Sequence, residues 1–157
     1  MLSQNHLKSI YYTLIHPHLS YGLVIWGSAY KTHIHRLEIL QKKAVRCITN
    51  SNYNAPTDGL FQKLNILPLE KLYKLETAKL MFLSQRGELP STLLKLFVTN
   101  TEIHKHNTRH QLKTHQLVSR SFIHNAPHIW YDVPPHIKNM KTVGSFCTKM
   151  KMLLQQR

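Results

Sequence analysis

Residues 34–50 constrain the fold of this chain more than any other stretch. At 100° per residue, the apolar side chains of this stretch share one arc of a helix and the basic side chains share the opposite arc. The apolar arc holds Ile34, Leu37, Leu40, Ala44, Val45, Cys47 and Ile48, and the basic arc holds Arg36, Lys42, Lys43 and Arg46. The pattern predicts an amphipathic helix packed on a core. Its basic face has two interpretations, an ordinary solvated surface or an anion-binding surface.

Helical spacing recurs on both sides of this stretch, and no alternating strand pattern of useful length occurs. We expect further helices over 2–15, 57–64, 68–85 and 93–97, a short one capped by Ser20, and a last one capped by Thr142. The prolines are expected to stop or kink the first helix at Pro17 and to prevent a long element at Pro127, Pro134 and Pro135. These patterns predict an all-α fold, a small irregular helical bundle with a basic, loop-rich insertion and a C-terminal helix.

The charge balance points to a polyanionic partner. Twenty-one Lys and Arg residues against seven Asp and Glu residues give a net charge of +14 with histidine neutral. A field this positive favours nucleic acid, the commonest polyanion. A membrane surface is the weaker candidate, because the basic residues are spread along the chain and no run of 18 apolar residues occurs.

The first residues lack the pattern of a secretory signal peptide. We therefore expect an intracellular protein, in the nucleus or cytoplasm, and not a secreted one. The first helix is expected to begin almost at Met1 without a cap, which indicates a piece of something longer.

Two basic strips are the candidate nucleic-acid-binding residues. They are Arg36, Lys42, Lys43 and Arg46 in the central helix, and Lys105, Arg109, Lys113 and Arg120 in the histidine-rich segment. Such side chains neutralise backbone phosphates, so they hold nucleic acid in a salt-dependent manner without reading its sequence. For Trp26 and Trp130, packing in the core is favoured over stacking on bases.

No catalytic residue, metal site or cofactor is predicted. Polymerase chemistry needs carboxylates that hold two divalent ions, and no two of the seven acidic residues are adjacent. The histidines of the basic segment have no cysteine or carboxylate at a recurrent zinc-ligand spacing; they are His104, His106, His110 and His115. Cys47 and Cys147 are interpreted as small buried hydrophobic residues and not as a disulfide.

Four stretches, in this order, resemble the region downstream of the polymerase core in non-LTR (LINE-type, jockey-like) retrotransposon reverse transcriptases. The first comprises Tyr12, Leu14, Ile15, Pro17, Leu19, Tyr21, Gly22, Trp26 and Gly27. The second is ILQKKAVRCI, the third is LNILPLEKLYKLETAKLMF, and the fourth joins HNTRH to SFIHNAPHIWYDVPPHI. The chain departs from the family at Tyr131 and Asp132, where an asparagine usually follows the tryptophan.

The resemblance implies a thumb-like helical region, which in intact enzymes grips template and primer behind the active site. The family's palm, with its aspartate pair, has no counterpart in these residues. The implied organisation is a thumb-like region over 1–97, a basic, His-rich and Pro-rich connection over 98–135, and a C-terminal amphipathic helix over 136–157. Two alternatives stay open: a protein-interaction module docking on an acidic partner or on a separate polymerase palm, and a degenerate copy without activity.

Overall fold

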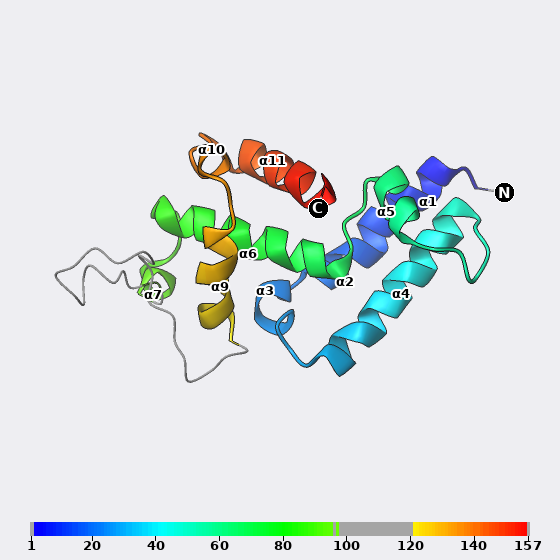
Figure 1. The fold of residues 1–157 in the computed structure, drawn as a ribbon, viewed down its shortest axis with the longest axis horizontal. Helices are drawn as coiled ribbons and strands as arrows, with labels where there is room; N and C mark the ends of the chain where they lie inside the picture. The colour runs from blue at the N-terminus through cyan, green and yellow to red at the C-terminus, as the bar shows by residue number, and fades with distance from the viewer. Residues whose placement is uncertain (1, 96, 98–120, 157) are drawn as a thin grey trace. The chain divides into compact units, whose positions relative to one another are not determined.

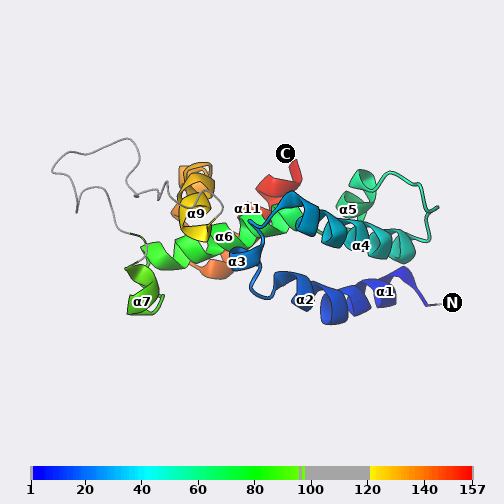
Figure 2. The same ribbon diagram turned by 90° about the horizontal axis from the view of Figure 1, so that it is seen from below.

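Every regular element in the described part of the chain is a helix. The computed structural model describes residues 2–95, 97 and 121–156 (Figure 1 and Figure 2). The elements in chain order are α1 (Gln4–Ile10), the π-helical segment η1 (Tyr11–Ile15), α2 (His16–Ser20), α3 (Leu23–Trp26), α4 (Lys31–Thr49), α5 (Asp58–Leu64), α6 (Leu69–Gln85), α7 (Ser91–Leu94), α9 (Phe122–Tyr131), α10 (Pro135–Lys138) and α11 (Val143–Gln156). The prediction of an all-α fold with a C-terminal helix is confirmed for these residues.

The chain divides into two compact units. The first unit contains Met1–Tyr73 and Gln155–Arg157, and the second contains Lys74–Leu154. The boundary falls inside α6, so this helix contributes residues to both. The division into 1–97, 98–135 and 136–157 stays a prediction, because most of its middle segment lies outside the described residues.

Pro17 was expected either to stop or to kink the first helix, and in the structure it does not stop it. The chain widens into η1, where the backbone N–H of His16 donates to the carbonyl of Tyr11, five residues earlier. This wider turn directly precedes the proline, which has no N–H to donate. The helical path then continues as α2 to Ser20, and the N–H of Tyr21 donates to Pro17 O at 2.9 Å.

Two cap predictions near the N-terminus were wrong. Ser3 caps α1, since its Oγ accepts from the N–H of His6. Ser20 does not cap α3; its hydroxyl donates to Pro17 O at 3.3 Å within α2. The residue before α3 is instead Gly22, whose φ of 61° is a left-handed conformation that glycine adopts without steric cost.

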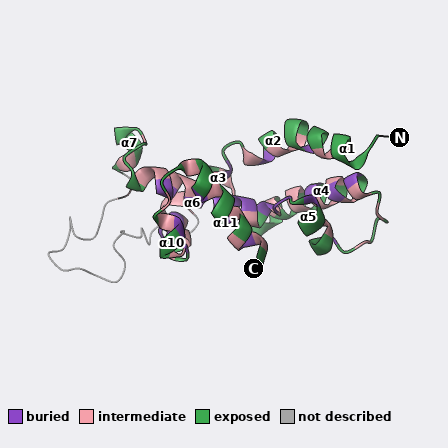
Figure 3. Ribbon diagram, turned by 90° about the horizontal axis from the view of Figure 1, so that it is seen from above, coloured by how far each residue is buried: buried purple, intermediate pink, exposed green. Residues whose placement is uncertain are grey.

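The core of the first unit lies between η1, α4 and α5. Its buried members are Tyr11, Val45, Ile48, Phe61, Leu64 and Ile66. In Figure 3 buried residues mark α4, whereas α1 and α7 contain none. The predicted amphipathic helix is therefore confirmed as the element that carries this core.

The apolar arc of α4 is narrower than predicted. Leu40 is 58% exposed and Cys47 is also exposed, so neither packs in the core. Each directly precedes a buried residue, Gln41 or Ile48, and therefore points about 100° away from the buried direction. The interpretation of Cys47 as a buried hydrophobic residue was wrong.

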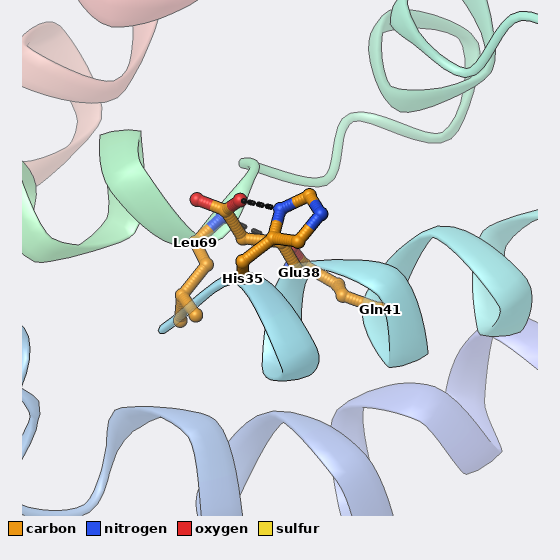
Figure 4. A network of polar contacts seen from close by, with 4 residues as sticks. All are labelled: His35, Glu38, Gln41 and Leu69. Carbon is orange, nitrogen blue, oxygen red and sulfur yellow. Dashed lines mark hydrogen bonds and ion pairs between the residues drawn. The ribbon is translucent and has the colours of Figure 1, made fainter. Parts of the chain in front are cut away.

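A buried amide, that of Gln41, occupies the centre of this inner face. Its Nε2 donates to Tyr11 Oη and to the carbonyl of Leu67, both at 2.9 Å. Its Oε1 accepts from the backbone N–H of Leu69, also at 2.9 Å, as one dashed line in Figure 4 shows. One side chain thus satisfies polar groups of η1, of the segment before α6, and of the first turn of α6.

We expect Gln41→Met to lower the free energy of unfolding by about 3 kcal/mol, because methionine keeps the length but leaves buried polar groups without partners. Gln62→Met is the matched control, since Gln62 is an exposed glutamine of the same unit. Chemical denaturation followed by circular dichroism measures both changes. Equal stability of the two variants would contradict the role assigned to this amide.

Gly27 is required by close packing at the end of α3. A Cβ built on Gly27 would lie 2.3 Å from Cδ2 of Tyr73 and 2.5 Å from the carbonyl oxygen of Leu23. Real Cβ atoms essentially never approach other heavy atoms this closely. The glycine of the tryptophan-glycine pair in the first resembling stretch thus has a steric reason in this fold.

Gly27→Ala is expected to destabilise the first unit by about 1–3 kcal/mol through overpacking against Tyr73. Gly59→Ala is the control: nothing lies within 4 Å of the added methyl group, and alanine is the better helix former in α5. Thermal melts should therefore move in opposite directions. A melting temperature for Gly27→Ala at or above that of the unmodified chain would refute the steric argument.

The second unit has its own aromatic core. The rings of Phe82 and Phe146 stack with centroids 4.5 Å apart, and Trp130 lies 6.1 Å from Phe146. Trp130 is buried, which confirms its predicted place in a core. Thr142 caps α11, as predicted, by accepting from the N–H of Ser145 at 3.2 Å.

Pro127 does not interrupt its segment, contrary to the prediction. It lies buried inside the ten-residue helix α9, which continues to Tyr131. A proline removes one helical hydrogen bond, and here its ring is placed among buried side chains. Pro134 and Pro135 do separate α9 from the short α10, as expected.

Candidate nucleic-acid interface

The structure divides the basic strip of α4 into two pairs. Arg36 and Lys43 are exposed, whereas Lys42 and Arg46 are half-buried on the flank of the helix. Seven residues separate Arg36 from Lys43, so they point within about 20° of each other, two turns apart. These two cations form the outward basic face of α4.

The charge of this outward face is not opposed within its own helix. The one carboxylate of α4 belongs to Glu38, which points about 140° or more away from Arg36 and Lys43. Glu38 is half-buried and its Oε2 lies 3.4 Å from Nδ1 of His35, the second dashed line in Figure 4. The outward basic face of α4 therefore has no carboxylate of its own helix beside it.

Arg46 has a structural function that the sequence pattern did not reveal. Its Nε donates to the carbonyl of Ala55 at 3.0 Å. Its own carbonyl accepts from the N–H of Ser51 at 3.0 Å, beside Asn50, which ends α4 in a left-handed conformation with a φ of 49°. Arg46 therefore fixes the segment that leads from α4 to α5.

A pocket of about 400 Å³ opens at the C-terminal end of α4. We call it the α4-end pocket; its lining residues are Lys43, Arg46, Cys47, Asn50, Ser51 and Tyr53. Sequence reasoning missed Tyr53, which follows α4 in a cluster of turn-forming residues and is 73% exposed. The sequence signal that could have identified Tyr53 is the presence of an aromatic residue within a polar turn.

The second predicted basic strip falls on residues 105–120. Lys105, Arg109, Lys113 and Arg120, with His104, His106, His110 and His115, lie outside the described residues. Within residues 2–95, 97 and 121–156 no group of three or more His, Cys, Asp or Glu side chains could hold a metal ion. The second basic strip stays a prediction.

Trp26 takes part in local structure and is only half-buried. Its Nε1 donates to the carbonyl of Tyr21 at 2.7 Å, across the Gly22 turn. Around it the surface is unusually apolar: Tyr21 is 86% exposed and Ile25 is 78% exposed. The expectation that Trp26 packs in a core was therefore too strong.

Burial changes the acidity of several groups in the two units. Burial raises the pKa of Tyr11, and the hydrogen bond from Gln41 opposes that shift. Burial also raises the pKa of Cys147 in the second unit. Lys138 has its pKa lowered by burial, and it lies 5.2 Å from the ring centroid of Trp130. Lys138 therefore contacts the aromatic core through its own ammonium group.

We expect Arg46→Met to lower the free energy of unfolding by about 1 kcal/mol, since it keeps the apolar stem but removes the donor to Ala55. Lys43→Met, one turn away and exposed, should leave stability within about 0.5 kcal/mol. Denaturant titration of both variants provides the measurement. If Lys43→Met costs as much as Arg46→Met, the structural role of the Arg46 hydrogen bond is disproved.

Comparison with known proteins gives one informative similarity. The chain is 31% identical over 72 residues to a Drosophila melanogaster protein described as "Probable RNA-directed DNA polymerase from transposon BS". The aligned part covers 46% of this chain and 8% of that protein, so the chain spans only a small fraction of the relative's length. This similarity supports a relationship to a reverse transcriptase. No protein-family model and no solved structure matches the chain.

Among the helices of the described residues, none is both long enough and apolar enough to cross a bilayer.

Proposed function

We propose that this chain is a non-catalytic, thumb-like region of a non-LTR, jockey-like reverse transcriptase that binds template–primer nucleic acid through phosphate contacts. The observation that carries the proposal is the outward basic face of α4, where Arg36 and Lys43 lie exposed and away from the single carboxylate of their helix. The similarity to a transposon polymerase and the net charge of +14 are its further support.

The proposed mechanism is electrostatic grip without sequence readout. Each phosphate neutralised by Arg36 or Lys43 releases condensed counterions, and this release makes binding favourable at low salt. The contacts orient the strand but carry no base information. Residues 105–120, with their four predicted cations, would extend the contact along the backbone. No catalytic residue, metal or cofactor belongs to this proposal.

Binding to another protein is the second candidate function, and the exposed apolar side chains favour it. Tyr21, Ile25 and Leu14 are each more than half exposed in the first unit. A large exposed apolar patch commonly marks a protein-binding surface or an aggregation liability. In this alternative the chain docks on an acidic partner or on a separate polymerase palm; a degenerate copy without activity would instead aggregate.

The outward basic face is tested by the variant Arg36→Gln/Lys43→Gln. The slope of log affinity against log salt on a B-form DNA duplex should fall by about 0.9 for each lost contact, with weaker binding to all sequences. Fluorescence anisotropy across a salt series measures the slope, on a DNA duplex and on an RNA–DNA hybrid. Unchanged affinity and slope would eliminate this face as the site.

The matched control is Lys63→Gln/Lys149→Gln, which removes the same charge from exposed positions on α5 and α11. It should retain the slope of the unmodified chain. Polyglutamate, an acidic polyanion without bases or phosphates, separates specific nucleic-acid binding from attraction by charge alone. Equal affinity for polyglutamate and nucleic acid, lost together near physiological salt, would mean that the charge of the chain acts without specificity, and it would contradict the proposed function.

A further inference from the structure

The residues that line the α4-end pocket offer three kinds of group that can contact a nucleotide: cations, uncharged polar groups and an aromatic ring. Two of its six lining residues, Lys43 and Arg46, are cationic, and none of the six is acidic. Asn50 and Ser51 supply polar groups, and Tyr53 supplies a flat ring. Its volume of about 400 Å³ lies within the range of about 300–1,000 Å³ that small-ligand pockets occupy.

The guanidinium of Arg46 is held in place before any ligand arrives. Its Nε–H is used in the 3.0 Å hydrogen bond to Ala55, and a guanidinium has five N–H donors. A donor fixed in this way binds phosphate without paying the full cost of ordering its side chain. Lys43, exposed one turn earlier on α4, adds a second and more mobile charge.

These cations also counter an unfavourable feature of the location. The C-terminal end of a helix carries a partial negative charge, which repels anions. Here the carbonyl of Arg46 accepts from the N–H of Ser51, and the carbonyl of Cys47 accepts from the N–H of Asn50. The last turn of α4 is thereby capped, and the charges of Lys43 and Arg46 dominate the pocket.

The segment after α4 presents Tyr53 to this cationic pocket. Tyr53 is 73% exposed, although a tyrosine ordinarily contributes buried area. The Arg46 hydrogen bond to Ala55 and the contact of Thr49 Oγ1 with Ser51 Oγ at 2.8 Å restrain the segment on both sides of Tyr53. An exposed ring on a restrained support is the arrangement on which nucleobases stack.

We propose that the α4-end pocket binds an unpaired nucleotide of a single-stranded nucleic acid, with its phosphate on Lys43 and Arg46 and its base stacked on Tyr53. This inference rests on the proposed function and adds a class of ligand to it, because a base inside a duplex has no free face for the ring. The chain then contacts both a paired backbone, through the outward basic face, and an unpaired base, through the pocket.

Stacking and charge contacts are distinguishable by their salt dependence. We expect Tyr53→Ala to weaken binding of an oligo-dT strand of about 12 nucleotides by roughly five-fold to a hundred-fold at every salt concentration, with an unchanged salt slope. Tyr53→Phe should bind like the unmodified chain, since it keeps the ring. Affinity of Tyr53→Ala for a blunt DNA duplex should not change.

The control variant is Tyr21→Ala, which removes another highly exposed ring of the first unit outside the pocket. It should bind oligo-dT as the unmodified chain does. Circular dichroism of all variants confirms that each one is folded. Unchanged oligo-dT binding by Tyr53→Ala, or an equal loss with Tyr21→Ala, would overturn the pocket assignment.

Cys47 offers an independent readout, because it lines the pocket and is exposed. In a Cys147→Ser background, oligo-dT should slow alkylation of Cys47 by iodoacetamide, and the blunt duplex should slow it much less. Thymidine monophosphate at the same concentration should give no protection, since it lacks the rest of the strand. Equal protection by the mononucleotide would overturn the assignment to a strand and indicate a free-nucleotide site.

The failure of this inference differs from the failure of the proposed function. If Arg36→Gln/Lys43→Gln reduces the duplex salt slope but Tyr53→Ala leaves oligo-dT binding intact, only the pocket assignment is wrong. If the unmodified chain binds neither duplex nor oligo-dT more tightly than polyglutamate, the proposed function itself is wrong.

Discussion

The buried amide of Gln41 is the interaction on which the first unit depends. It lies in the middle of an otherwise apolar helix face, and a polar group there is tolerated only when its hydrogen bonds are satisfied. It bonds to Tyr11, Leu67 and Leu69, which come from three different segments. An apolar residue could fill the same space, but it could not fix where α6 begins relative to α4.

The same helix that is anchored by Gln41 also presents the candidate binding residues. Lys43 follows Gln41 by two positions and points outward. Arg46 has two roles: it bonds to the segment that connects α4 to α5, and it lines the α4-end pocket. The helical register that buries Val45 and Ile48 also decides which cations of α4 face solvent, so core packing determines the arrangement of the surface charges. A rotation of α4 by one residue would bury charge and expose the core.

Sequence periodicity predicted the helices well, because long amphipathic stretches such as α4 and α6 carry a strong signal. It failed where a neighbouring segment decided the outcome. Pro127 lies within α9 and does not interrupt it. Leu40 and Cys47 each directly precede a buried residue of α4 and are themselves exposed. Trp26 donates a hydrogen bond to the turn that precedes it and is only half-buried. In the basic strip, helical spacing identified the cations but could not tell that Arg46 holds Ala55, since that carbonyl follows the end of the helix.

The π-helical turn η1 sets an exact length for the N-terminal segment. The hydrogen bond that closes this turn joins residues five apart, one more than in an α-helix. Insertion of one residue into an α-helix produces a turn of this kind. Its tyrosines use that register: Tyr11 is buried beside Gln41, and Tyr12 Oη donates to the carbonyl of Asn65 at 3.1 Å. Deleting a single residue here would twist α1 by about 100° about its axis. In homologous chains, the exposed residues of this segment should therefore vary freely, whereas the length of the segment should be conserved.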